Sequence, residues 1–82
     1  MNDYVFTKHA RDMMEERKIT EDLVMRVIHE ADDSFTGDDG NLHFTKAIAE
    51  NENRVLHVIV NSTISPKRIV TLFFDRRLRS KP

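Results

Sequence analysis

The chain has 82 residues, of which 39% are hydrophobic and 33% are charged, and its formal net charge is -1. A chain of this length builds one small core, and this composition excludes disordered and collagen-like proteins. There is no Cys, which excludes disulfides and thiolate chemistry. No apolar run approaches the roughly 18 residues that a membrane helix requires, and the first residues do not resemble a secretory signal. We therefore expect a single cytoplasmic domain over residues 1–82, with no membrane partner.

The charges are distributed unevenly along the chain. Residues 30–53 contain seven acids against Lys46 alone, whereas residues 66–82 contain six bases. A cationic end beside an anionic loop steers a polyanion to one edge of a protein. The alternative is that both are solvated charge runs with no partner.

The first half of the chain predicts two helices. Thr7 is a good N-cap for a helix over residues 8–18, and Thr20 caps a second helix over residues 20–31. In the first helix, Arg17 shares an arc of about 100° with apolar residues, and His9 lies at the edge of that arc. We therefore expect Arg17 to face the core and His9 to be half-buried against it.

The second half has the alternation and the turn residues of β-strands. Strands are predicted at 34–37, 42–49, 54–61 and 68–75, and the basic residues 76–82 are expected to fray. Two helices followed by a run of strands indicate an α+β fold. We expect the helices to pack on a three- or four-stranded antiparallel meander.

The histidines are the first candidates for chemistry. His9 lies in the first helical turn, where the helix dipole favours the neutral imidazole that a general base requires. His57 is a single polar ring in a strand of aliphatic residues. Each has a plain structural alternative, as a hydrogen-bonded boundary or core side chain. The four histidines do not have metal-site spacing, and no cofactor motif is present, so we expect neither a metal nor a cofactor.

Arginines supply the candidate phosphate-binding groups. Arg68, Thr71, Arg76 and Arg77 lie on or beside the last predicted strand, where guanidinium forks would bind phosphate in two-toothed fashion. Their alternative role is to keep a strand edge charged against aggregation. Arg17 on its apolar arc needs a carboxylate, carbonyl or phosphate partner, unless its side chain reaches solvent at the helix end.

The segment from Phe6 to Thr20 resembles the opening of a family of small bacterial domains of unknown function. Members begin with His-Ala, continue through a helix to an Arg-Gly-Ile-Ser/Thr junction, and end in strands similar to residues 54–59 and 68–72. Lys18 stands here at the position of the usual Gly. That family is similar to the RelE/ParE/BrnT toxin superfamily, in which two N-terminal helices pack on an antiparallel sheet.

This resemblance implies a metal-independent endoribonuclease of a toxin–antitoxin pair, with RNA or the ribosome as its target. His9, Arg17, Arg54 and Thr71 are the residues that carry over. In this hypothesis His9 or His57 is the acid or base, and Arg17 and other arginines hold phosphate. The alternative is a non-catalytic module of the same fold that docks a small antitoxin-like protein by strand addition. The near-neutral charge favours that alternative, because RNases of the superfamily that act on the ribosome are usually strongly basic.

Overall fold

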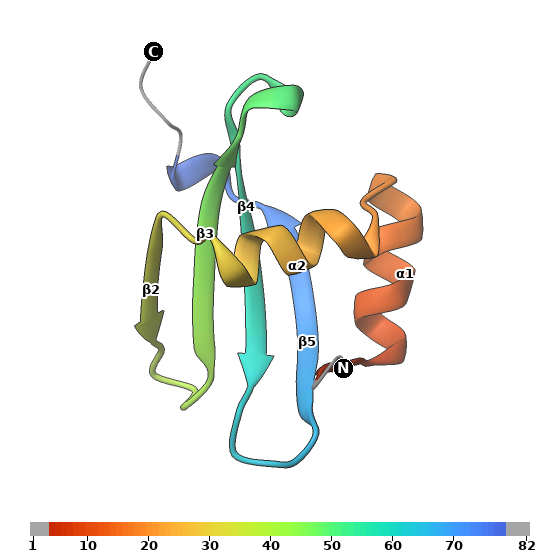
Figure 1. The fold of residues 1–82 in the computed structure, drawn as a ribbon, viewed down its shortest axis with the longest axis vertical. Helices are drawn as coiled ribbons and strands as arrows, with labels where there is room; N and C mark the ends of the chain where they lie inside the picture. The colour runs from red at the N-terminus through yellow and green to blue at the C-terminus, as the bar shows by residue number, and fades with distance from the viewer. Residues whose placement is uncertain (1–3, 79–82) are drawn as a thin grey trace.

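The computed structural model describes residues 4–78. They form one five-stranded sheet with two helices on one of its faces (Figure 1). The strands are β1 (Tyr4–Phe6), β2 (Asp33–Thr36), β3 (Leu42–Ile48), β4 (Arg54–Asn61) and β5 (Lys67–Phe74), in the order β1-β5-β4-β3-β2. The helices are α1 (Lys8–Arg17) and α2 (Glu21–His29), and short 3-10 helices follow β3 (Ala49–Asn51) and β5 (Arg76–Leu78).

The expected α+β class is confirmed, but a purely antiparallel sheet of three or four strands is wrong. β2 to β5 form an antiparallel meander, and β1 adds a fifth strand that runs parallel to β5. Its three residues are too short to show an alternation in the sequence. They are defined only by pairing with a strand about 60 residues further along the chain, for example Phe6 with Ile69.

Both helices begin at the expected threonines. The Thr7 hydroxyl accepts the amide of Ala10 and donates to the carbonyl of Val70, so this cap also ties α1 to β5. Thr20 accepts the amide of Leu23 in the same way. These bonds satisfy helix amides that would otherwise have no partner. α2 is shorter than predicted, because the chain turns into β2 after His29.

α1 ends on Lys18, which adopts the left-handed conformation with φ 57°. The amide of Ile19 donates to the carbonyl of Met14, and the amide of Lys18 donates to that of Glu15. This is the Schellman arrangement, in which an apolar contact accompanies the hydrogen bonds. Ile19 and Met14 are both buried in the core. The position where the family resemblance expected Gly is therefore left-handed, although Lys occupies it.

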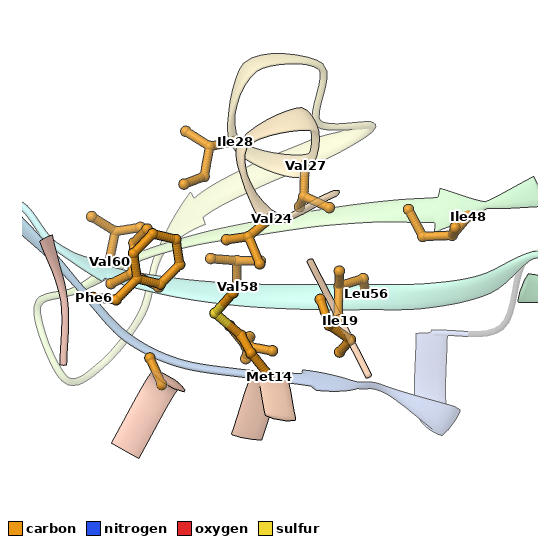
Figure 2. Close-up of a cluster of buried hydrophobic side chains, with 13 residues drawn as sticks. Phe6, Met14, Ile19, Val24, Val27, Ile28, Ile48, Leu56, Val58 and Val60 are labelled. Atoms are coloured by element: carbon orange, nitrogen blue, oxygen red, sulfur yellow. The ribbon is translucent and has the colours of Figure 1, made fainter. Parts of the chain in front are cut away.

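The core lies between the helices and the facing side of the sheet (Figure 2). From β4, Leu56, Val58 and Val60 are fully buried, and Val24 and Val27 of α2 pack on them. α2 lies across the sheet, while α1 lies beside β5 (Figure 1). Alternate residues of each strand point to the other face, which neither helix covers.

That helix-free face carries the buried polar side chains Thr45 and His57. Register pairs Thr45 with His57, and His57 with Phe73. A β-bulge between Ile59 and Val60 shifts the register of β5, and beyond it the residues of β5 again alternate between the two faces.

Within the described part of the chain, neither helix could span a membrane. The last four residues of the tail predicted to fray lie outside the described residues, whereas Arg76–Leu78 form a 3-10 helix.

Candidate acid–base site on the helix-free face

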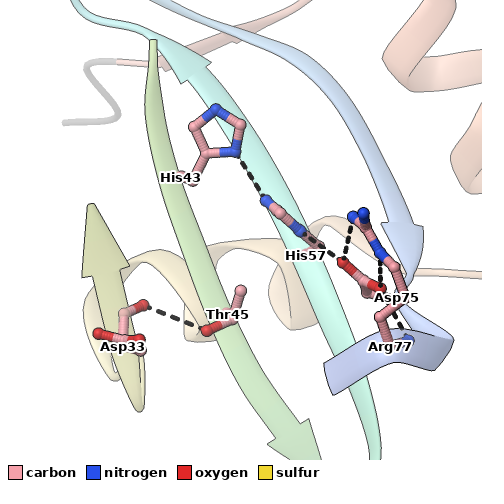
Figure 3. Close-up of polar contacts among 6 residues, drawn as sticks. All are labelled: Asp33, His43, Thr45, His57, Asp75 and Arg77. Carbon is pink, nitrogen blue, oxygen red and sulfur yellow. Dashed lines mark hydrogen bonds and ion pairs between the residues drawn. The ribbon is translucent and has the colours of Figure 1, made fainter. Parts of the chain in front are cut away.

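A continuous line of hydrogen bonds crosses the helix-free face (Figure 3). His43 Nδ1 lies 2.8 Å from His57 Nε2, and His57 Nδ1 lies 3.1 Å from Asp75 Oδ2. At one end, Arg77 donates to Asp75 from its amide at 3.0 Å and from its guanidinium at 3.3 Å. At the other end, His43 Nε2 lies 3.3 Å from Asp39 Oδ1. We call this line of five side chains the relay.

Each relay residue is placed by a different part of the fold. His43 and His57 come from the neighbouring strands β3 and β4, two residue positions apart in register and on the same face, and their ring centroids are 5.0 Å apart. Asp75 directly follows β5, and its amide continues the sheet by donating to the carbonyl of Val55. Asp39 lies in the turn between β2 and β3. The relay therefore forms only when β3, β4 and β5 are in register.

The buried centre of the relay is electrostatically balanced. The Asp75 side chain is 3% exposed and that of His57 is 6% exposed. Bulk water therefore neither solvates the carboxylate nor takes the place of the hydrogen bonds that these two side chains make. The hydrogen bonds from Arg77 are the main cause that lowers the pKa of Asp75 to about 2, and burial opposes this shift. Asp75 is therefore an ionised acceptor at neutral pH. Its companion Arg77 is 83% exposed and presents its charge to solvent.

A hollow of about 740 Å³ opens beside the relay. His57, Asp75 and Arg77 form part of its wall. The other lining residues are Asp32, Asp33, Phe35, Thr45, Lys46, Ala47 and Val55. Its charged groups include a weak pair of Lys46 and Asp32 at 3.7 Å. The rim of the hollow is therefore cationic at Arg77 and acidic along β2.

Aromatic rings enclose the two imidazoles. Phe35 of β2 stacks on His43 with centroids 4.9 Å apart, and Phe73 of β5 stacks on His57 at the same distance. Phe35 is nevertheless 46% exposed. It therefore covers His43 with one face and leaves apolar surface at the mouth of the hollow.

The structure brings together some of the predicted site residues and separates others. His57 and Arg77 belong to the relay. Thr71 and Arg68 lie on the same face, because register pairs them with Ile59 and Asn61 along the strand from His57. Arg76 is exposed on the 3-10 helix after β5.

Three other predicted residues do not belong to this face. His9 was expected to be half-buried and Arg17 to face the core, and both expectations are wrong, since both side chains are exposed on α1. α1 contributes Ala10 and Met14 to the core, and Ile19, which follows the helix, is buried with them. Arg54 lies over the ring of Phe74, at 4.4 Å from its centroid, rather than beside the relay.

Sequence reasoning missed four participants: Asp39, His43, Asp75 and Phe35. His43 had a detectable signal, because it alternates with Leu42 and Phe44 and so belongs to the face opposite the core. Asp75 had no such signal, because Asp is a common residue directly after a strand. No group of three His, Asp or Glu side chains among residues 4–78 is arranged to hold a metal ion.

Comparison with known proteins gives a family and no function. Over residues 6–74 the chain matches the model of a family described as a domain of unknown function (DUF4258). The chain belongs to this family. No curated protein and no solved structure matches it. The DUF4258 match confirms the expected membership in a small domain family of unknown function, and it carries no link to the RelE/ParE/BrnT toxins.

Proposed function

We propose that this DUF4258 protein is a metal-independent endoribonuclease whose reactive group is the His43–His57 pair. The observation that carries the proposal is the relay, in which a partly exposed imidazole is held by a buried imidazole and a buried, ionised carboxylate. A base oriented by a second group, which is itself oriented by a third, is the usual arrangement for activating a hydroxyl.

His43 Nε2 is the atom that accepts and then returns the proton in the proposed reaction. Its partner in the free protein is Asp39, which is 47% exposed and makes one of the longest contacts of the relay, at 3.3 Å. A ribose 2′-hydroxyl replaces Asp39 there, gives its proton to Nε2 and attacks the adjacent phosphorus. The bond to the 5′-oxygen breaks, and Nε2 returns the proton to that oxygen. The products are a 2′,3′-cyclic phosphate and a 5′-hydroxyl, so protons and bonds balance.

The remaining residues have binding roles. Arg77 offers a guanidinium at the rim of the hollow for a neighbouring phosphate. Phe35 presents an exposed ring on which an unpaired base can stack, as single-stranded RNA commonly does on proteins. The acidic residues of β2 oppose a polyanion, so we expect binding no tighter than micromolar at physiological salt, the range of non-specific complexes.

A cleavage assay with a chelator present tests the proposal. Wild-type protein should cleave single-stranded RNA, free or on ribosomes, but not the same strand with 2′-deoxyribose at the cleaved position. His43→Asn should abolish cleavage, whereas His9→Ala, on the exposed side of α1, should leave it unchanged. Absence of cleavage by the wild type on both substrates would refute the proposal, and so would an active His43→Asn.

The contribution of Arg77 is tested by salt dependence. If it contacts a phosphate, Arg77→Ala should reduce the slope of log affinity against log salt by about 0.7, the value per phosphate on a single strand. Arg54→Ala is the matched control, because Arg54 lies over Phe74 and should not alter the slope. Equal slopes for both variants would remove Arg77 from the binding site.

A second candidate function rests on a different observation, the outer edge of β2. β2 is the last strand of the sheet, and all four of its residues are exposed. Such an edge accepts another extended chain by strand addition. Asp33 lies in this strand, and Asp32, Asp38 and Asp39 flank it, so charge favours a basic partner strand.

Hydrogen exchange tests strand addition directly. The protein would be co-expressed with the product of a neighbouring reading frame, and the complex compared with the free protein. Docking at this edge should protect the amides of residues 33–36 and leave those of β1, the opposite edge, unchanged. Protection confined to β1 or to the helices would exclude β2 as the docking site.

A further inference from the structure

The relay contains more contacts than two neutral imidazoles can satisfy. Three contacts each require one hydrogen: His57 to Asp75, His43 to His57, and His43 to Asp39. Two neutral rings carry only two N–H groups between them. The carboxylates cannot supply the third, because hydrogen bonds lower the pKa of both Asp39 and Asp75 and keep them ionised at neutral pH.

We propose that His43 and His57 act as one acid–base unit that takes up a single proton, and that Asp39 is the positioning residue that holds it. With one extra proton the pair has three N–H groups, and every contact of the relay is made. Without it, His57 still donates to Asp75 and His43 still donates to His57. The lone pair of His43 Nε2 then faces the Asp39 carboxylate. Because two acceptors repel each other, the hydrogen bond between Nε2 and Asp39 is lost.

A second extra proton does not fit the geometry. His43 Nδ1 and His57 Nε2 are 2.8 Å apart, so two N–H groups would point at each other across this gap. The charged groups around the pair are Asp39 in the turn, and Asp75 and Arg77 after β5. Asp33 on β2 and the Asp32–Lys46 pair line the same hollow as His57. Two carboxylates against one guanidinium at the relay itself suit one additional positive charge, not two.

Gly37 shows that the fold reserves space for this contact. A Cβ at Gly37 would lie 2.4 Å from His43 Nε2 and 2.9 Å from Asp39 Oδ1. Any side chain there would displace the imidazole or the carboxylate. Gly40, in the same turn, is required for a different reason: its φ is +81°, and a Cβ there would meet nothing within 4 Å.

This inference deepens the proposed function, since it identifies two forms of the reactive group. The neutral pair has a lone pair on Nε2 and is the form able to accept the proton of a 2′-hydroxyl. In the protonated pair, His43 Nε2 carries a hydrogen that it donates to Asp39, so it cannot accept the proton of a 2′-hydroxyl. The test below uses no RNA, so its outcome is separate from that of the cleavage assay.

The test is a pH titration of the imidazole nitrogens by ¹⁵N NMR, in which chemical shifts distinguish an N–H from a lone pair. His9 and His29 are exposed on the helices, outside the relay, and their signals serve as internal references. His43 and His57 should together take up one proton while the protein remains folded.

Two variants test the role of the turn. Asp39→Asn removes the charge but keeps an oxygen acceptor, and we expect the pair to bind its proton about tenfold more weakly, with His9 unaffected. Gly37→Ala should disrupt the signal of the N–H shared by the two rings. Gly40→Ala strains the same turn without touching His43, and it should preserve that signal.

The wild-type titration is decisive by itself. If His43 and His57 each take up a full proton in the folded protein, the single-proton unit is refuted. If the pair takes up one proton but Asp39→Asn binds it as tightly as the wild type, Asp39 is not the residue that holds it.

Discussion

The two faces of the sheet use the same strands for different purposes. In β4, Leu56, Val58 and Val60 point to the helices and are fully buried among aliphatic side chains. Between them, His57 points to the other face and is almost as buried, yet it is covered by rings and hydrogen bonds. One face is stabilised by the removal of apolar surface from water, and the other by polar groups that satisfy one another. Burial alone therefore does not distinguish a core from a candidate site.

The largest expected effect comes from breaking the helix-covered face. Leu56→Ala leaves a cavity in the centre of the core and should lower the free energy of unfolding by about 3 kcal/mol. Ile59→Ala, on the same strand but on the partly exposed face, should lower it by only about 1 kcal/mol. Urea denaturation measures both. Equal losses would mean that the two faces contribute alike.

The helix-free face should instead depend on pH. The pKa of Asp75 is lowered to about 2, so its contribution to stability is complete above its ordinary pKa near 4 and is lost as the pH falls toward 2. At neutral pH, Asp75→Asn should lower the free energy of unfolding by about 2 kcal/mol, the range for a hydrogen bond to a charged group. The difference from wild type should shrink across that acidic window.

Urea denaturation at a series of pH values checks this expectation. Asp38→Asn is the control, since Asp38 is exposed in the turn. A constant difference between wild type and Asp75→Asn from neutral pH down to pH of about 2 would contradict the assigned ionisation.

The smallest expected effect comes from a substitution at the end of α1, which alters neither face of the sheet. Lys18→Gly should raise the free energy of unfolding by about 1 kcal/mol, because glycine adopts the left-handed conformation without steric cost. Glu16→Gly, inside the same helix, should lower it by about 1 kcal/mol. Thermal unfolding of the two variants gives the sign. A destabilised Lys18→Gly would show that the Lys18 side chain makes a contribution that outweighs its backbone strain.

Most elements could be predicted from local patterns. The two threonine caps placed both helices, and the apolar run of β4 was predicted with its observed bounds, because capping and alternation are properties of a few neighbouring residues. β1 was missed, since three residues have no periodicity. The exposure of Arg17 was also missed, because a helical projection does not show that Ile19, after the end of the helix, is the side chain buried in the core there.

The sequence alone determined the fold class, the threonine caps of the two helices and the position of His57 as a polar ring within an apolar strand. Only the tertiary structure decided what His57 touches. Its partners come from two other segments, His43 from β3 and Phe73 and Asp75 from the end of β5, and register brings them together. A shift of one residue in that register would exchange the faces and separate the relay. Local chemistry specifies which residues can form a strand, whereas the pairing of strands distant in sequence specifies which side chains share a site.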